Sequence, residues 1–166
     1  VSVATGDING DGRSDIAASD KVGNVHVFIC SQDTTPTTIN GALTKTNIML
    51  TAQKEWSSLV FGNLNSDGCA DLVVGAPALY TSRGRVRFYA GGRASDGSPI
   101  LSLRTGMEIA GVDQPGAEFG CSVALADFNG DGYNDVIIGA RGEDVDTDSN
   151  KTLDAANAGR AYVYVG

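Results

Sequence analysis

The chain is poor in the residue types that define several protein classes. Its 166 residues include four prolines, one tryptophan and one histidine, and only 19% of them are charged. Together with 22 glycines, this mixture excludes collagen, a coiled coil and a disordered tail. No stretch approaches the roughly 18 consecutive apolar residues of a membrane-spanning helix. The composition therefore indicates a globular domain.

Positive charge is also scarce, with 12 Lys and Arg against 20 Asp and Glu and a formal net charge of −8. We expect such a chain to bind neither nucleic acid nor an anionic membrane surface, because both depend on clustered basic residues. The three cysteines are an odd number and do not make a disulfide framework. The sequence begins with Val1 and shows no signal peptide, which we interpret as a mature product or a fragment. A metal binder, a partner-binding module and an enzyme remain.

A polar pattern of nine residues occurs three times, starting at Asp7, Asn63 and Asp127, with periods of 56 and 64 residues. Each copy follows a short segment of alternating small and apolar residues. An apolar run of strand length comes after it, and then another strand that opens after a glycine. A weaker fourth strand is expected near 46–50 and 100–103, and no segment has a helical period. The repeat predicts an all-β fold of β-propeller blades, each with four antiparallel strands.

We predict a single partial propeller domain over residues 1–166. Its blades span about 1–52, 53–112 and 113–166, boundaries that follow the repeat. The third copy stops after its third strand and so lacks an outer strand. Three blades are fewer than the about four to eight of a closed ring, and open sheet edges are normally covered or paired. We therefore expect the chain to form part of a larger propeller or of an assembly.

The repeated loop has the residue types of a site for a hard cation. Oxygen-bearing side chains occupy positions 1, 3, 5 and 9, and glycine always occupies position 6, where a tight loop needs a positive φ. Position 7 varies, as expected if only its backbone carbonyl is used. Oxygen ligands without His or thiolate favour Ca²⁺ over Mg²⁺ in such an irregular loop. The predicted ligands of three Ca²⁺ ions are Asp7, Asn9, Asp11, Arg13 and Asp15; Asn63, Asn65, Asp67, Cys69 and Asp71; and Asp127, Asn129, Asp131, Tyr133 and Asp135.

Two other interpretations of the loops are weaker. An EF-hand needs a Glu at position 12, where this chain has Ala18, Val74 and Ile138 inside an expected strand. The Asp at position 9 must then close the site. Simple turns also favour Asp-Gly and Asn-Gly. However, unpaired carboxylates gathered in one short loop would repel each other, and three Ca²⁺ ions would reduce the formal charge from −8 to −2.

Taken together, these features resemble the FG-GAP repeat of integrin α-subunit propellers. The third copy has Phe119-Gly120 at the FG position and Gly139-Ala140-Arg141 at the GAP position. The second has Trp56-Ser57 and Gly75-Ala76-Pro77, and the first has Ala17-Ala18-Ser19 at GAP. The resemblance implies Ca²⁺ loops on one propeller face, between the first two strands, with partners often on the opposite face.

The connections between the second and third strands differ in length, which places insertions on the face opposite the loops, where binding surfaces often lie. In the longest connection, Asp144, Asp146 and Asp148 have 1-3-5 spacing, which fits either a further cation site or a solvated acidic loop. Asn150-Lys151-Thr152 is a sequence for N-glycosylation.

A few single residues also carry predictions. His26 lies within an expected strand without a catalytic neighbour, which favours a packing or surface role. Trp56 favours packing, with sugar stacking as the alternative. In the resembled topology Cys30 and Cys69 lie on the same face, so either a bridge between neighbouring blades or separate thiols fits.

The leading hypothesis is a non-enzymatic, extracellular or cell-surface Ca²⁺-binding β-propeller module for protein–protein interaction or adhesion. Its Ca²⁺ is structural, and its partner is another protein or a second copy of the chain. The alternatives are a structural subunit of a self-assembling extracellular polymer and a lectin-like propeller that binds glycans. An enzyme is the weakest hypothesis, because every strong Asp cluster is already explained as a metal site.

Overall fold

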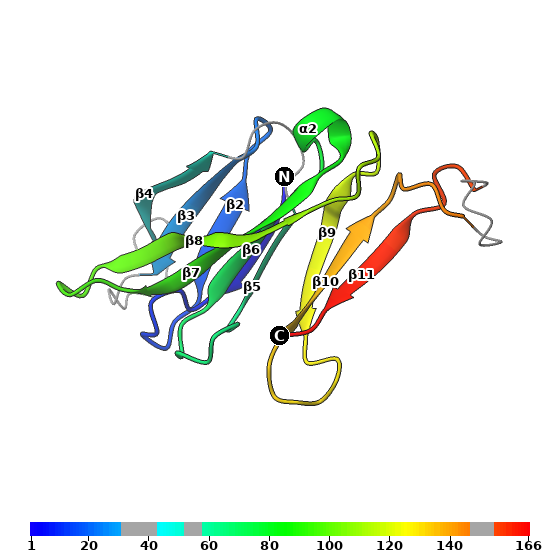
Figure 1. The fold of residues 1–166 in the computed structure, drawn as a ribbon. Helices are drawn as coiled ribbons and strands as arrows, with labels where there is room; N and C mark the ends of the chain where they lie inside the picture. The colour runs from blue at the N-terminus through cyan, green and yellow to red at the C-terminus, as the bar shows by residue number, and fades with distance from the viewer. Residues whose placement is uncertain (31–42, 52–57, 147–154) are drawn as a thin grey trace.

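The computed structural model describes residues 1–30, 43–51, 58–146 and 155–166, and they form three antiparallel sheets (Figure 1). The first sheet contains β1 (Val3–Gly6), β2 (Asp15–Ser19), β3 (Asn24–Cys30) and β4 (Leu43–Thr51) in that spatial order. The second contains β5 (Ser58–Gly62), β6 (Asp71–Ala76), β7 (Arg85–Arg93) and β8 (Pro99–Ala110). The third contains β9 (Phe119–Ala126), β10 (Asp135–Ala140) and β11 (Arg160–Tyr164). Each sheet is referred to below as a blade.

Blade 2 packs on both of its neighbours, and its central strand β6 is buried along its whole length. Because successive side chains of a strand point to opposite faces, Leu72 and Val74 join the core with blade 1, while Val73 joins the core with blade 3. This double burial explains why the sequence of β6 is a continuous apolar run rather than an alternating one. Two hydrophobic cores, one in each seam between blades, therefore hold the structure together.

Close approach of the backbones shapes the seam between blades 2 and 3. A Cβ atom on Gly75 would lie 2.1 Å from the Gly120 carbonyl oxygen, so only glycine fits there. The Ser58 hydroxyl donates a hydrogen bond to that same oxygen at 2.8 Å. Phe119 is 1% exposed and meets Tyr162 edge-on. The FG motif of one blade thus packs against the GAP glycine of the blade before it.

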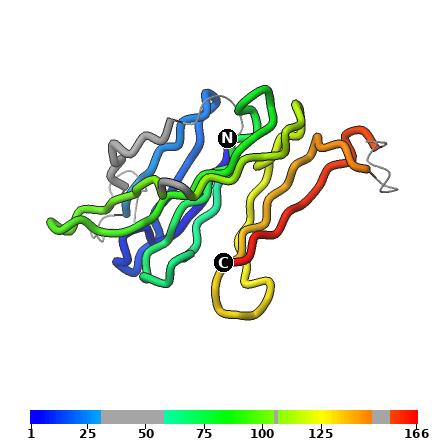
Figure 2. Tube along the Cα trace, in the orientation of Figure 1, coloured from blue at the N-terminus to red at the C-terminus, as the bar shows by residue number. Residues whose placement is uncertain are grey.

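The nine-residue loops and the connections between second and third strands lie at opposite ends of the blades (Figure 1). In Figure 2 the Cα trace likewise turns at one end of the blades for the nine-residue loops and at the other end for the connections between second and third strands. The connection after β6 contains one short turn, α2 (Leu79–Ser82), whose Tyr80 and Thr81 have left-handed rather than helical dihedral angles. The sequence did not indicate this turn.

The structure confirms the all-β fold and the three antiparallel sheets. The weak fourth strands are longer than predicted, because β4 runs over Leu43–Thr51 and β8 over Pro99–Ala110. Within the described residues the third sheet has three strands, as the sequence predicted. No helix in this part of the chain is long and apolar enough to cross a membrane.

Candidate metal loops

The loop of blade 1 is built around the side chains at positions 1, 3 and 5. The Asp7 carboxylate accepts hydrogen bonds from the Asp11 and Gly12 amides at 3.0 and 2.7 Å. Asn9 Oδ1 accepts the same Asp11 N–H, and its Nδ2 donates to Asp11 Oδ2 at 3.3 Å. Asp11 Oδ1 accepts the Arg13 amide at 2.9 Å. The side chain at position 7 takes no part in these bonds, in keeping with its variability.

Blade 3 repeats this arrangement, and blade 2 repeats part of it. Asp127 accepts hydrogen bonds from the amides at positions 4, 5 and 6, and Asn129 and Asp131 bond as their counterparts do in blade 1. In blade 2, Asn65 and Asp67 keep their bonds, but Asn63 accepts only the Asn65 amide, at 3.3 Å. The replacement of Asp by Asn at position 1 therefore coincides with a loosened loop.

Two positions in each loop have a left-handed backbone. The glycine at position 6 has φ between 84° and 91°, as predicted. Position 4 is left-handed as well, at Gly10, Ser66 and Gly130. Sequence reasoning missed position 4 because Ser66 breaks the glycine pattern. The glycine at position 4 of the other two copies was the sequence signal that could have indicated this left-handed backbone.

The Asp at position 9 is the most deeply buried acidic side chain of each loop. Asp15 accepts the Ile8 amide at 3.0 Å and the Cys30 amide at 2.8 Å. Asp71 accepts the Leu64 and Gly91 amides, and Asp135 accepts the Phe128 and Gly166 amides. All three carboxylates are at most 1% exposed. Each therefore joins the start of its loop to the end of the third strand, a role that the sequence analysis did not foresee.

The surroundings of these carboxylates act on their pKa values in different directions. Burial raises the pKa of Asp15, and the nearby Asp11 and Asp7 charges raise it further against the two backbone hydrogen bonds. Burial also raises the pKa of Asp71. The pKa of Asp135 is lowered, chiefly because the Gly166 amide donates to its charged form. In blades 1 and 2 the charged form of the position 9 carboxylate is therefore disfavoured, and a nearby cation would favour it.

The donor set of the loops fits a hard cation in chemistry and in backbone conformation. A carboxylate has about four acceptor sites, so the position 9 Asp can hold two amides and still face a cation. However, no group of three or more Asp, Glu, His or Cys side chains in the described ranges is gathered closely enough to hold a metal. Instead, the carboxylates at positions 1 and 5 accept amides of their own loop.

Neighbouring loops also contact each other. The Ala70 amide donates to the Asp7 carbonyl at 2.7 Å, and Asn134 Nδ2 donates to the Asn63 carbonyl at 3.0 Å. In both cases position 8 of one loop reaches position 1 of the loop in the preceding blade. Arg93 Nε adds a hydrogen bond to the Asn9 carbonyl. The loops therefore form a connected row along one end of the molecule.

Of the other residues that carried predictions, some are described by the structure and some lie outside the described ranges. Cys30, Cys69 and Cys121 are all described and none is in a disulfide, so of the two alternatives for Cys30 and Cys69 the structure has separate thiols. In the acidic connection, Asp144 accepts the Asn157 amide at 2.7 Å, while Asp148 lies outside the described residues. Trp56 and the Asn150 glycosylation sequence also lie outside them.

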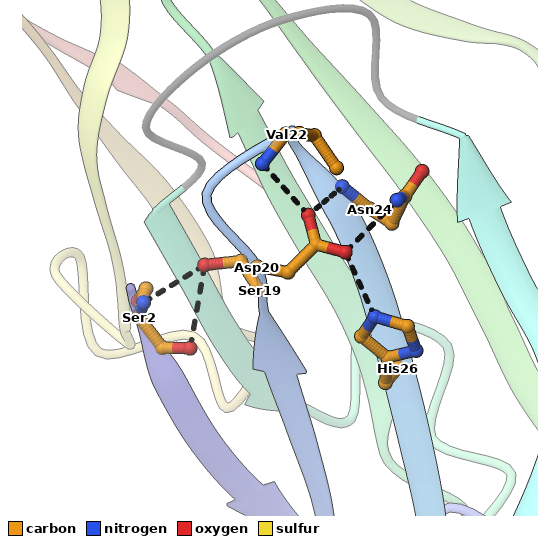
Figure 3. A network of polar contacts seen from close by, with 6 residues as sticks. All are labelled: Ser2, Ser19, Asp20, Val22, Asn24 and His26. Atoms are coloured by element: carbon orange, nitrogen blue, oxygen red, sulfur yellow. Dashed lines mark hydrogen bonds and ion pairs between the residues drawn. The ribbon is translucent and has the colours of Figure 1, made fainter.

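His26, for which the sequence favoured a packing or surface role, is half-buried and takes part in a polar cluster. Its Nε2 lies 2.9 Å from Asp20 Oδ2, and Asp20 also accepts hydrogen bonds from Val22 and Asn24 (Figure 3). The side-chain bonds from Asn24 and His26 hold the pKa of Asp20 well below its usual value. Nearby, Ser19 Oγ accepts the Ser2 amide and ties β2 to the start of the chain. This polar cluster fixes the β2–β3 turn.

Comparison with known proteins gives the same repeat. The FG-GAP repeat family matches residues 1–28, 56–89 and 119–164, which together make up more than half of the chain. The chain is 34% identical to integrin alpha pat-2 of Caenorhabditis elegans and to integrin alpha-5 of Xenopus laevis, in each case over 84% of its length. It is 36% identical to phosphatidylinositol-glycan-specific phospholipase D of Bos taurus over 66% of its length. It spans only 12–13% of the lengths of these relatives. The chain belongs to the FG-GAP repeat family.

Proposed function

We propose that the protein is a non-enzymatic, extracellular or cell-surface Ca²⁺-binding module for protein–protein interaction, in which Ca²⁺ has a structural role. The observation that carries the proposal is the anchored Asp at position 9. Asp15, Asp71 and Asp135 each link an oxygen-rich loop to the third strand of the same blade. A cation held at the loop would therefore stabilise the blade and, through the contacts between loops, the row of blades.

The matches to two integrins support a binding role, and the Ca²⁺ loops leave the opposite end of the blades available for a partner. One relative is named as a phospholipase and two as integrins, so the repeat itself does not define a catalytic activity. We assign the interaction role to the repeats, and any chemistry to other parts of such proteins.

Urea unfolding in about 10 mM Ca²⁺ and in excess chelator tests the structural role of the cation. With dissociation constants of about 0.1–1 mM, typical of extracellular modules, each site adds roughly 1.4 kcal/mol or more under these conditions. Asp127→Asn should reduce the Ca²⁺-dependent gain, because it gives loop three the position 1 residue of loop two. Asp96→Asn, which removes a charge from the exposed β7–β8 turn, is the matched control. Superimposable curves with and without Ca²⁺ would contradict the proposal.

A further inference from the structure

Figure 1 shows α2 at the end of blade 2 opposite the metal loops. Tyr80 of α2 lines a small pocket together with Arg83, Arg85, Ala110, Gly111 and Asp113. Its volume is about 200 Å³. Pockets for drug-sized ligands begin at about 300 Å³, so this one has the size for a single side chain.

Two of the residues that line the pocket have a side-chain hydrogen-bond donor without a partner in the protein. Arg83 Nε and Arg85 Nε are the two buried side-chain polar atoms without a hydrogen-bond partner in the described part of the chain. A buried donor without a partner is unfavourable, and more so when it is charged. Two such atoms in side chains that line one pocket make it a candidate site for an acceptor. Both belong to guanidinium groups, which cannot act as acceptors, so the missing group is an acceptor.

The other ends of these guanidinium groups are paired in different ways. Arg85 shares Glu108 with Arg87, and each arginine bonds one oxygen of that carboxylate. Arg83 Nη2 bonds Asp113 Oδ1 at 2.6 Å, and the Asp113 side chain is 83% exposed. An ion pair this exposed contributes little to stability, so water or another carboxylate can replace Asp113 at little cost. Asp113 therefore occupies the place that an incoming carboxylate would take.

The backbone beside the pocket is strained at three consecutive residues. Tyr80, Thr81 and Ser82 have φ of 53°, 59° and 61°, a left-handed run that residues other than glycine rarely adopt. The amides of Gly116 and Glu118 hold this turn by donating to the carbonyls of Thr81 and Ser82. The turn places the Tyr80 ring, which is 54% exposed, against the Arg85 guanidinium, 4.2 Å from the ring centroid.

We propose that this pocket binds a single carboxylate side chain of a partner protein, which displaces Asp113 and accepts hydrogen bonds from Arg83 and Arg85. A planar carboxylate matches the fork of a guanidinium group, and the Tyr80 ring offers an apolar wall for the methylene groups of an Asp or Glu. The inference rests on the proposed role in protein binding but does not depend on Ca²⁺.

The net charge of −8 does not prevent this binding. The local set of Arg83, Arg85 and Arg87 against Glu108 and Asp113 carries one excess positive charge. The acidic loops lie at the other end of the blades, and at physiological salt exposed charges are screened beyond about 8 Å. The pocket is thus a positive spot on an acidic protein, which favours a single acidic side chain over a long acidic tract.

NMR detection of the arginine Nε–H signals tests the proposal directly. The probe is the blocked peptide acetyl-Gly-Asp-Gly-amide, with acetyl-Gly-Asn-Gly-amide and inorganic phosphate as comparisons. We expect the Asp peptide to shift the Arg83 and Arg85 signals saturably and the Asn peptide to leave them unchanged. Asp113→Asn should tighten binding about threefold or more, because the internal competitor loses its charge. Arg83→Gln should weaken binding at least about tenfold.

Arg160→Gln is the matched control, because Arg160 is as exposed as Arg83, at 44% against 42%, and is also paired with an acidic residue. It should leave the affinity unchanged.

Equal binding of the two peptides, tighter binding of phosphate, or an unchanged affinity in Asp113→Asn would overturn the proposal. The last variant keeps both arginines, so it decides the matter even if Arg83→Gln does not fold. A protein that does not bind the peptide but is still stabilised by Ca²⁺ against unfolding would contradict this site alone. A protein that binds the peptide but shows no effect of Ca²⁺ on unfolding would contradict only the Ca²⁺ proposal.

Discussion

The loops of blades 1 and 3 have the same predicted ligand types but very different surroundings. In loop one, Ile8 is 0% exposed and Asn9 is 6% exposed, whereas Phe128, which corresponds to Ile8, is 71% exposed. The difference comes from blade 2, which contacts loop one through Ala70 and Arg93. Nothing in the described chain covers loop three in this way. The motif therefore determines the bonds inside a loop, and the neighbouring blade determines how deeply the loop is buried.

Removal of the Asp at position 9 should give the largest difference between the two loops. Asp15→Ala leaves the amides of Ile8 and Cys30 without an acceptor in a buried site, which should cost about 3 kcal/mol. Asp135→Ala should cost about 1 kcal/mol, since the two amides that it frees belong to the exposed residues Phe128 and Gly166, where water can replace the carboxylate. Urea unfolding in chelator measures both. Equal losses would show that burial does not separate the loops.

The contact from blade 2 to loop one should give the next largest difference. Arg93→Ala removes the hydrogen bond to the Asn9 carbonyl and should destabilise the protein by about 1 kcal/mol. Arg141→Ala, which breaks the exposed pair with Glu118 inside blade 3, should cost less than about 0.5 kcal/mol. Thermal unfolding of the two variants side by side provides the measurement. A larger effect for Arg141→Ala would reverse the comparison.

Glycine at position 4 offers a finer comparison. Gly10→Ala and Gly130→Ala both place a side chain at positive φ, which should cost about 1 kcal/mol in each loop. Gly10→Ala should cost about 0.5 kcal/mol more, because its new Cβ would lie 3.2 Å from Cys69 Sγ in blade 2. No atom lies within 4 Å of the corresponding position at Gly130. Denaturant midpoints resolve this difference, and a greater loss for Gly130→Ala would contradict it.

The smallest effect is expected at the opposite end of blade 1, in the half-buried Asp20 cluster. Because folding lowers the pKa of Asp20, its contribution to stability is present above about pH 4 and is lost as the pH falls further. Solvent screening keeps this contribution small. Asp20→Asn should therefore lose less stability than the parent between pH 5 and 3. Urea midpoints at a series of pH values test this, and parallel curves would argue against it.

The sequence predicted much of the fold because its repeat places strands, turns and glycines at fixed offsets. The start of β6 at Asp71 and of β10 at Asp135 followed directly from the loop pattern. The roles that depend on a second blade were not predictable in this way. Neither the approach of Gly75 to Gly120 nor the unused donors of Arg83 and Arg85 has a local signature. They arise from residues that only the packing of blades brings together.

The two kinds of hydrogen bond around the loops also imply an order of folding. The bonds of Asp15 join residues seven and 15 positions apart, whereas the seam bonds from Ser58 and Arg93 span 62 and 84 positions. Closing a short chain segment costs less entropy than closing a long one, and contacts that are close in sequence form faster. Each blade can therefore assemble around its own Asp before the seams form. Such a chain would join finished blades one after another, and its slowest steps would be the encounters between them.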